Sequence, residues 1–158
     1  AQKYKINCKI LGYDTFEDGF LKSTLNVKDV SIKNEKIELK EKIDNFYPTK
    51  LEVEQVLKKF YTSAEYSPTL IKGDILKTLK KEENIPSNIS LLRMDTDLYS
   101  TTKLQLETLY PKLEKGGILH IDDYGFCPGV KDAVDEYFTN QKIWLHRVDL
   151  SCRLMIKS

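Results

Sequence analysis

Short apolar runs alternate with amphipathic segments along this chain, and the alternation restricts its fold more than any other feature. Four apolar runs predict strands: residues 5–13, 68–72, 89–94 and 118–121. Three segments with apolar residues at helical spacing predict helices: residues 50–61, 101–113 and 129–138. Ser100 or Thr101 would cap the second helix. Strands that alternate with helices indicate an α/β fold, with a mostly parallel sheet and helices on both faces.

The carboxyl-terminal part of the chain departs from this alternation. Two further strands are predicted at residues 142–150 and 153–157, and a link as short as theirs favours an antiparallel pair. Gly116 and Gly117 are expected to end the preceding helix as a C-cap pair. The sequence has no internal repeat and no Pro/Gly-rich linker, so residues 1–158 are predicted to form one domain.

Composition excludes several classes of protein. The 158 residues are 41% hydrophobic and 31% charged, which is typical of a globular domain and not of a disordered chain. The formal net charge of +1 argues against a nucleic-acid partner bound through a basic face. No apolar run approaches the roughly 18 residues of a membrane span, so no membrane partner is expected. Three scattered cysteines fit reduced thiols in a cytoplasmic protein.

An aspartate lies at or just after the end of each of the four strands. These residues are Asp14, Asp74, Asp95 and Asp122. In an open α/β sheet, ligands bind at the carboxyl ends of the strands, so these side chains are expected at one edge. Asp97 and Asp123 add further carboxylates, and such crowding favours an oxygen-bound cation such as Mg²⁺. The structural alternative, in which the aspartates are helix caps and turn residues, stays open.

Four segments carry a more specific pattern, in the order YDTFEDG (residues 13–19), KGDILKTL (72–79), LLRMDTDLYST (91–101) and GGILHIDDYG (116–125), with AVDEYF at residues 133–138. Together they resemble the macrocin O-methyltransferase family. The pairing of DTDLYST with DDYG carries most of the specificity. The resemblance implies a Rossmann-like class I methyltransferase sheet with a carboxyl-terminal antiparallel hairpin. It also implies S-adenosylmethionine- and Mg²⁺-dependent methylation of a hydroxyl on a saccharide or a glycosylated small molecule.

The same resemblance assigns roles to the aspartates. Three would hold the divalent metal: Asp95, Asp122 and Asp123. Asp97 would be the general base that removes the proton from the acceptor hydroxyl. Asp14 would accept hydrogen bonds from the ribose hydroxyls of the cofactor, and Asp74 would contact the adenine edge.

Two parts of the family pattern are missing. The glycine-rich loop that follows the family's first strand has no counterpart before Asp14, so that strand and loop are expected to be absent from residues 1–158. The family's first strand lies in the middle of the sheet, and its loss would leave unpaired inner edges. We therefore expect an incomplete domain that associates with itself or takes the strand from elsewhere. Residues 17–20 read EDGF where the family usually has EGLP.

Other functions fit part of the pattern. The DTD segment after an apolar strand is also found in phosphatases and phosphotransferases of the haloacid dehalogenase type, and DxD holds a metal in many glycosyltransferases. In the first class the DxD segment usually opens the domain, whereas two strand units precede it here and no clear lysine motif follows. The second class does not explain the DDYG segment. A third alternative is a catalytically inactive methyltransferase-like domain that serves in binding or assembly.

Arg93 lies within a strand and is expected to pair with a carboxylate, whereas Tyr99 and Tyr124 are expected either to line an acceptor pocket or to pack against the edge of the sheet.

Overall fold

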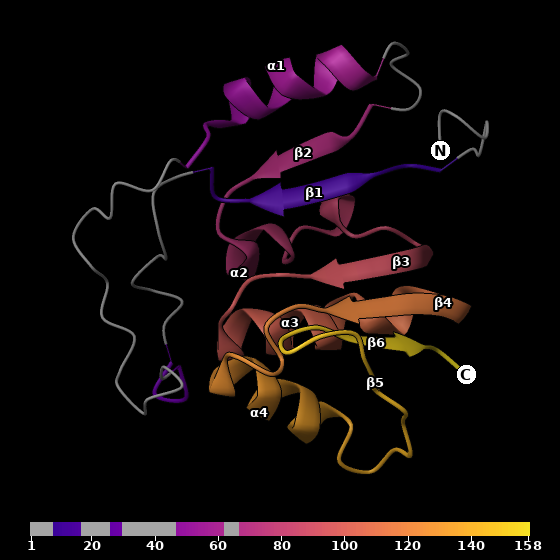
Figure 1. Ribbon diagram of the computed structural model, residues 1–158. Coiled ribbons are helices and arrows are strands. Elements are labelled where there is room, and N and C mark those ends of the chain that lie inside the picture. The colour runs from indigo at the N-terminus through magenta and orange to yellow at the C-terminus, as the bar shows by residue number, and fades with distance from the viewer. Residues whose placement is uncertain (1–7, 17–25, 30–46, 62–66) are drawn as a thin grey trace. The chain divides into compact units, whose positions relative to one another are not determined.

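The computed structural model describes residues 8–16, 26–29, 47–61 and 67–158 (Figure 1). The chain divides into two units. The first unit contains residues 1–19 and 40–80, and the second contains residues 20–39 and 81–158. That residues 1–158 form one domain stays a prediction.

The first unit has a two-stranded parallel sheet. Strand β1 (Leu11–Asp14) pairs in register with β2 (Thr69–Lys72), so that Asp14 lies opposite Lys72. The short helix α2 (Ile75–Thr78) follows β2 directly. Both strands were predicted, although the predicted run at residues 5–13 is a strand only from Leu11, and residues 5–7 lie outside the described part of the chain.

Helix α1 (Lys50–Phe60) begins where the sequence predicts. Thr49 and Glu52 form a capping box, in which each side chain accepts a hydrogen bond from the other residue's backbone N–H. Its expected buried stripe is different in the structure, because no residue of α1 is buried and Phe60 is 71% exposed. The spacing of apolar residues therefore predicted the helix correctly, but the prediction that one side of it is buried was wrong.

The second unit contains a four-stranded sheet in the order β3-β4-β6-β5. Strands β3 (Ile89–Met94) and β4 (Leu113–Ile121) are parallel. Strand β6 (Arg153–Ile156) is antiparallel to both β4 and the two-residue strand β5 (His146–Arg147). The antiparallel pair at the carboxyl end was predicted, but β5 is much shorter than the predicted run at residues 142–150.

Helices α3 (Tyr99–Thr108) and α4 (Pro128–Tyr137) provide the other half of the core of this unit. Buried and exposed side chains alternate along the strands, as expected when one face of a sheet is packed. The buried set includes Leu92, Met94, Leu106, Leu119, Ile121, Val130, Val134 and Met155. On the opposite face, Leu91 and Ile156 are more than 60% exposed, so the described residues of this unit do not form helical layers on both faces.

The connection from α3 to β4 differs from the prediction. The helix ends at Thr108, and a 3₁₀ turn, Tyr110–Lys112, follows it. Pro111 explains this early end, because proline cannot donate to the helical ladder and its ring clashes with the preceding turn. Gly116 and Gly117 are therefore not a C-cap. They lie inside β4, where Gly116 takes a φ of +80° and the register against β3 shifts.

A second short 3₁₀ turn, Glu82–Asn84, leads into β3. Among the described residues, no helix is both long and apolar enough to cross a membrane.

The packed face of the second unit gives a first prediction. Leu106 is fully buried, so Leu106→Ala should lower the free energy of unfolding by about 2–5 kcal/mol through lost transfer energy and a residual cavity. Leu150 is 78% exposed and serves as the control, since Leu150→Ala removes the same atoms from a solvated position. Urea denaturation measures both changes. Equal losses for the two variants would contradict the assigned core.

Candidate functional site

Parallel pairing of β3 and β4 brings their carboxyl ends together. The register places Met94 opposite Ile121, and the backbone N–H of Asp122 donates to the carbonyl of Met94 at 2.9 Å. Asp95 and Asp122 are the next residues after these strands, so they leave the sheet side by side. The sequence-based expectation of neighbouring carboxylates at one edge is confirmed for this pair of strands.

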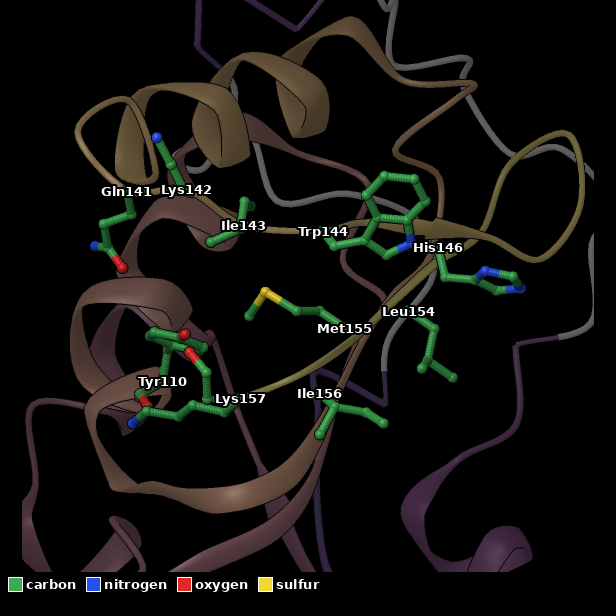
Figure 2. Close-up of a pocket in the computed structure, with 11 residues that line it drawn as sticks. Tyr110, Gln141, Lys142, Ile143, Trp144, His146, Leu154, Met155, Ile156 and Lys157 are labelled. Carbon is green, nitrogen blue, oxygen red and sulfur yellow. The ribbon is translucent and has the colours of Figure 1, made fainter.

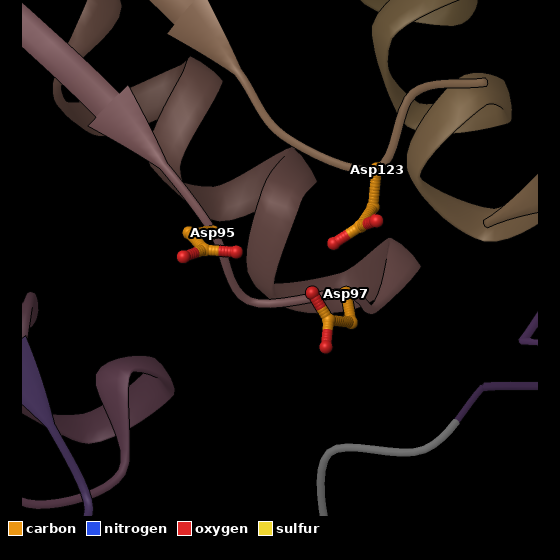
Figure 3. A group of neighbouring side chains, drawn as sticks. All are labelled: Asp95, Asp97 and Asp123. Atoms are coloured by element: carbon orange, nitrogen blue, oxygen red, sulfur yellow. The ribbon is translucent and has the colours of Figure 1, made fainter. Parts of the chain in front are cut away.

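Three carboxylates meet beyond these strand ends (Figure 3). Oxygen atoms of Asp95, Asp97 and Asp123 all lie within 4.8 Å of one another. Asp95 and Asp97 come from the β3–α3 connection and Asp123 from the β4–α4 connection. Mg²⁺ binds oxygen at about 2.1 Å, so opposite ligands of one ion lie about 4.2 Å apart. The group therefore needs only small side-chain movements to surround a divalent cation.

Two of the three cluster residues have an unusual backbone conformation. Asp97 and Asp123 have φ angles of 58° and 53°, in the left-handed region. Aspartate adopts this region more readily than most residues, but it still costs about 1–2 kcal/mol for each residue. Strain of this kind persists only where the surrounding contacts impose it, and it is common at functional sites.

Arg93 links the ends of the two strands electrostatically. Its guanidinium donates to Oδ2 of Asp95 and to Oδ2 of Asp122, each at 2.5 Å. The expectation that Arg93 pairs with a carboxylate is confirmed, and it pairs with two. The other oxygen of Asp122 accepts from the thiol of Cys152 at 2.9 Å, and these partners lower the pKa of Asp122. Asp122 thus lies beside the three-carboxylate cluster with both oxygens engaged.

Asp97 occupies the most unfavourable electrostatic position. Burial, together with a hydrogen bond and charge repulsion from Asp123, raises its pKa to about 7. Its Oδ1 is buried and has no hydrogen-bond partner among the described residues. A buried carboxylate beside two more carboxylates places negative charge where a bound cation would offset it. The residues present therefore fit a divalent metal.

The carboxyl-terminal hairpin contributes two contacts that sequence reasoning missed. Ser151 donates its hydroxyl to Oδ1 of Asp123 at 2.8 Å, and Cys152 donates to Asp122 as described above. The Asp122 carboxylate raises the pKa of the Cys152 thiol to about 12, so this cysteine stays protonated as a donor. The short link between the last two strands was the available signal, but nothing in its residue types indicated contact with the DDYG segment.

The two predicted cofactor residues lie in the first unit. Asp14 ends β1, and its Oδ1 accepts from the backbone N–H of Phe16 at 2.6 Å. Asp74 follows β2, is buried, and caps α2 by accepting from the N–H of Leu76 at 2.9 Å. They therefore lie at the carboxyl ends of neighbouring parallel strands, as predicted. The cap at Asp74 is the structural use considered from the sequence, and its contact with a cofactor stays a prediction.

The tyrosines beside the acidic segments are held by α4. Tyr99 donates to Glu136 and Tyr124 donates to Asp135, each at 2.6 Å.

A separate hollow of about 760 Å³ lies beside β6, and its lining includes Tyr110, the exposed Trp144 and His146 (Figure 2). None of the predicted acidic site residues lines it.

Comparison with known proteins agrees with the motifs. The family model for macrocin-O-methyltransferase (TylF) matches residues 14–155. The chain belongs to this family. The resemblance seen in the four sequence segments is thereby confirmed.

Curated relatives match a shorter stretch. Over 49 residues, which are 31% of the chain, it is 55% identical to demethyldecarbamoylnovobiocin O-methyltransferase of Streptomyces niveus. It is 45% identical over 49 residues to mycinamicin III 3''-O-methyltransferase of Micromonospora griseorubida. These stretches are each 19% of the length of the relative.

A solved structure matches nearly the whole chain. The O-methyltransferase NovP superposes on 99% of it with a TM-score of 0.77 at 25% identity. The calicheamicin methyltransferase CalS11 superposes on 94% with a TM-score of 0.65 at 24% identity. The Rossmann-like class I methyltransferase fold is confirmed. The chain spans 62% of the length of NovP and 60% of that of CalS11.

The raised pKa of Asp97 predicts a pH dependence in the absence of divalent cations. The folded state holds a proton on Asp97 up to about pH 7, whereas the unfolded state releases it near the ordinary value of 3.8. The free energy of unfolding should therefore fall as pH rises through this window, and Asp97→Asn should remove that part of the slope. Urea denaturation in a chelator at about pH 4, 5.5 and 7 measures the difference between the two proteins.

The exposed Asp132 of α4 provides the matched control, because Asp132→Asn removes one carboxylate from a solvated position. This control should follow the wild-type slope. A constant difference between wild type and Asp97→Asn across the window would contradict the assigned environment of Asp97.

Proposed function

We propose that this chain carries the catalytic residues of an S-adenosylmethionine-dependent, divalent-metal-assisted O-methyltransferase. Its acceptor is a hydroxyl of a saccharide or of a glycosylated small molecule. The observation that supports the proposal best is the carboxylate cluster at the ends of β3 and β4, in a chain that belongs to the macrocin-O-methyltransferase family. In their names, the relatives are O-methyltransferases of novobiocin, mycinamicin and tetracenomycin compounds, and the tetracenomycin enzyme acts on a rhamnosyl group.

The proposed metal ligands are those that the sequence indicates: Asp95, Asp122 and Asp123. Asp95 and Asp123 are supported by their place in the cluster, and Asp122 by its position next to Asp123 and Asp95. A bound divalent cation supplies positive charge that offsets the carboxylate repulsion and lowers the pKa of a hydroxyl in contact with it. Arg93 keeps Asp95 and Asp122 oriented by holding one oxygen of each.

Asp97 is proposed as the general base. It lies beside Asp95 and Asp123, close enough to reach a hydroxyl held at the cluster, and its Oδ1 has no other partner among the described residues. The acceptor proton passes to Asp97 while the acceptor oxygen forms its bond to the methyl carbon. When bound, S-adenosylmethionine would supply that methyl group from its sulfonium, and its sulfur would keep the electron pair of the broken bond. The remaining roles of the protein are to orient the acceptor and the cofactor and to remove the acceptor proton.

Asp14 and Asp74 are proposed to contact the cofactor, Asp14 at the ribose hydroxyls and Asp74 at the adenine edge. Their positions at the carboxyl ends of β1 and β2 support this role. We further propose self-association, a cytoplasmic location, and neither a nucleic-acid nor a membrane partner. The free cysteines Cys8, Cys127 and Cys152 and the net charge of +1 support the location and the absence of a basic binding face.

Binding of the cofactor tests the function directly. Isothermal titration of S-adenosylmethionine into the protein, with and without Mg²⁺, should show saturable binding of one equivalent per chain. A folded protein that binds Mg²⁺ but not S-adenosylmethionine would instead support either an inactive methyltransferase-like domain or a cofactor site that needs a segment outside residues 1–158.

Two substitutions separate metal binding from proton removal. Asp123→Ala removes a proposed ligand and should weaken Mg²⁺ binding by roughly 10- to 100-fold. Asp97→Asn keeps the size of the side chain and should retain both metal and cofactor binding while turnover falls by about 10²–10⁴-fold.

Calorimetry measures binding for both variants, and transfer of a radiolabelled methyl group to a glycosylated acceptor measures turnover. Asp132→Asn serves again as the control. Undiminished turnover in Asp97→Asn would eliminate Asp97 as the base. Loss of Mg²⁺ affinity in Asp97→Asn would make Asp97 a ligand instead.

A further inference from the structure

Helix α3 begins without a side-chain cap of its own. The residue at its N-cap position is Leu98, which has no polar side chain, and neither Ser100 nor Thr101 caps the helix as the sequence suggested. The first backbone N–H groups of a helix have no partner within the helix and need one from elsewhere. The start of α3 directly follows the DTD segment, so whatever satisfies it also determines how Asp97 is held.

Asp29 supplies the missing acceptor from a distant part of the sequence. Its Oδ1 accepts from the backbone N–H of Tyr99 at 2.6 Å, across 70 residues. Its Oδ2 accepts from the N–H of Asn26 at 2.7 Å, which closes the turn that carries Asp29. Asp29 is only 4% exposed, so this charged hydrogen bond forms away from water, where it is strong.

The contact between Asp29 and the helices requires a glycine. Gly129 lies in the first turn of α4, and a Cβ atom added there would come within 2.4 Å of Oδ1 of Asp29. It would also approach the carbonyl of Lys28 and the Cβ of Tyr99, each to 3.2 Å. Any larger residue at position 129 therefore displaces the Asp29 carboxylate from the start of α3.

Neighbouring contacts hold the same short segment against both helices. Lys28 forms an ion pair with Glu136 of α4, and its Nζ lies 4.4 Å from the centre of the Tyr99 ring. Glu136 in turn accepts from the hydroxyl of Tyr99. Residues 26–29 thus join the beginning of α3 to α4.

Contacts on both sides of Asp97 hold the backbone of this turn in place. On one side, the Thr96 hydroxyl is within 2.7 Å of the Thr101 hydroxyl and accepts from Gln105 at 2.9 Å. On the other side, Leu98 is buried and the N–H of Tyr99 is bound by Asp29. The left-handed conformation of Asp97 between these contacts is what directs its carboxylate toward Asp95 and Asp123.

We infer that Asp29 is a positioning residue for the acidic cluster. Its carboxylate caps α3 in the space left by Gly129 and thereby holds the turn that presents Asp97. Asp29 itself is not a member of the cluster of Asp95, Asp97 and Asp123. The consequence for metal binding rests on the proposed function, whereas the cap does not.

Backbone amide exchange of Tyr99 tests the cap independently of any metal. In ¹⁵N-labelled protein, the Tyr99 N–H should be protected, and Asp29→Ala should speed its exchange by at least about tenfold because the buried acceptor is lost. Asp29→Asn keeps one acceptor oxygen without the charge and should give intermediate protection. Gly129→Ala should give the same loss as Asp29→Ala by displacing an intact carboxylate.

Mn²⁺ affinity, followed by electron paramagnetic resonance, tests the link to the cluster. Asp29→Ala and Gly129→Ala should weaken Mn²⁺ binding by about tenfold, because the β3–α3 connection that they loosen also carries the proposed ligand Asp95. Losses of this size are common for residues that orient metal ligands. Leu106→Ala is the control for general destabilisation, and Asp132→Asn is the control for charge. Both should keep wild-type affinity at a temperature where every variant is folded.

The outcomes are distinguishable. If wild type binds no Mn²⁺, the proposed metal site fails, and the Tyr99 exchange rate still decides the cap. If Mn²⁺ binds and both Asp29→Ala and Gly129→Ala keep wild-type affinity, Asp29 does not position the cluster. Unchanged Tyr99 exchange in Asp29→Ala or Asp29→Asn overturns the inference outright, and so does an affinity loss in Leu106→Ala equal to that in Gly129→Ala.

Discussion

The parallel pairing of β3 with β4 is the contact on which the candidate site depends. Because Met94 lies opposite Ile121, the chain leaves both strands at the same level and delivers Asp95 and Asp122 side by side. Burial of Leu92, Met94, Leu119 and Ile121 stabilises this register, since a shift by one residue would move each of them to the other face of the sheet. The core that stabilises the second unit therefore also brings its carboxylates together.

Like charges brought together in this way require compensation, and the structure provides it unevenly. Arg93 pairs with one oxygen each of Asp95 and Asp122 and so offsets part of their charge, and the carboxyl-terminal hairpin donates from Ser151 to Asp123. Asp97 receives no such donor on its buried Oδ1 among the described residues. The charge that remains uncompensated is thus confined to one place, between Asp95, Asp97 and Asp123. A site arranged only for stability would have no reason to keep it.

Local sequence patterns predicted the elements better than their ends. The apolar spacing of α1 and α4 and the apolar run of β3 located those elements closely, because the signals lie within a few residues. The end of α3 was predicted too late, although its stripe, Leu106, Leu109, Tyr110 and Leu113, is buried throughout. The buried positions could be predicted from hydrophobicity alone. The helix boundary depends on Pro111, but the glycine pair at positions 116 and 117 was taken as the end of the helix instead.

The contacts missed from the sequence share one physical property, which is that their partners are distant in the chain. Ser151 reaches Asp123 across 28 residues and Asp29 reaches Tyr99 across 70. Neither Ser151 nor Asp29 belongs to a motif. A single hydrogen bond to a backbone N–H or to one carboxylate oxygen determines the residue type at one position only, so it leaves no pattern in the neighbouring sequence. The residues that carry charge at the cluster are recognisable in the DTD and DDY segments. Those that hold the cluster in shape emerge only once the chain has folded.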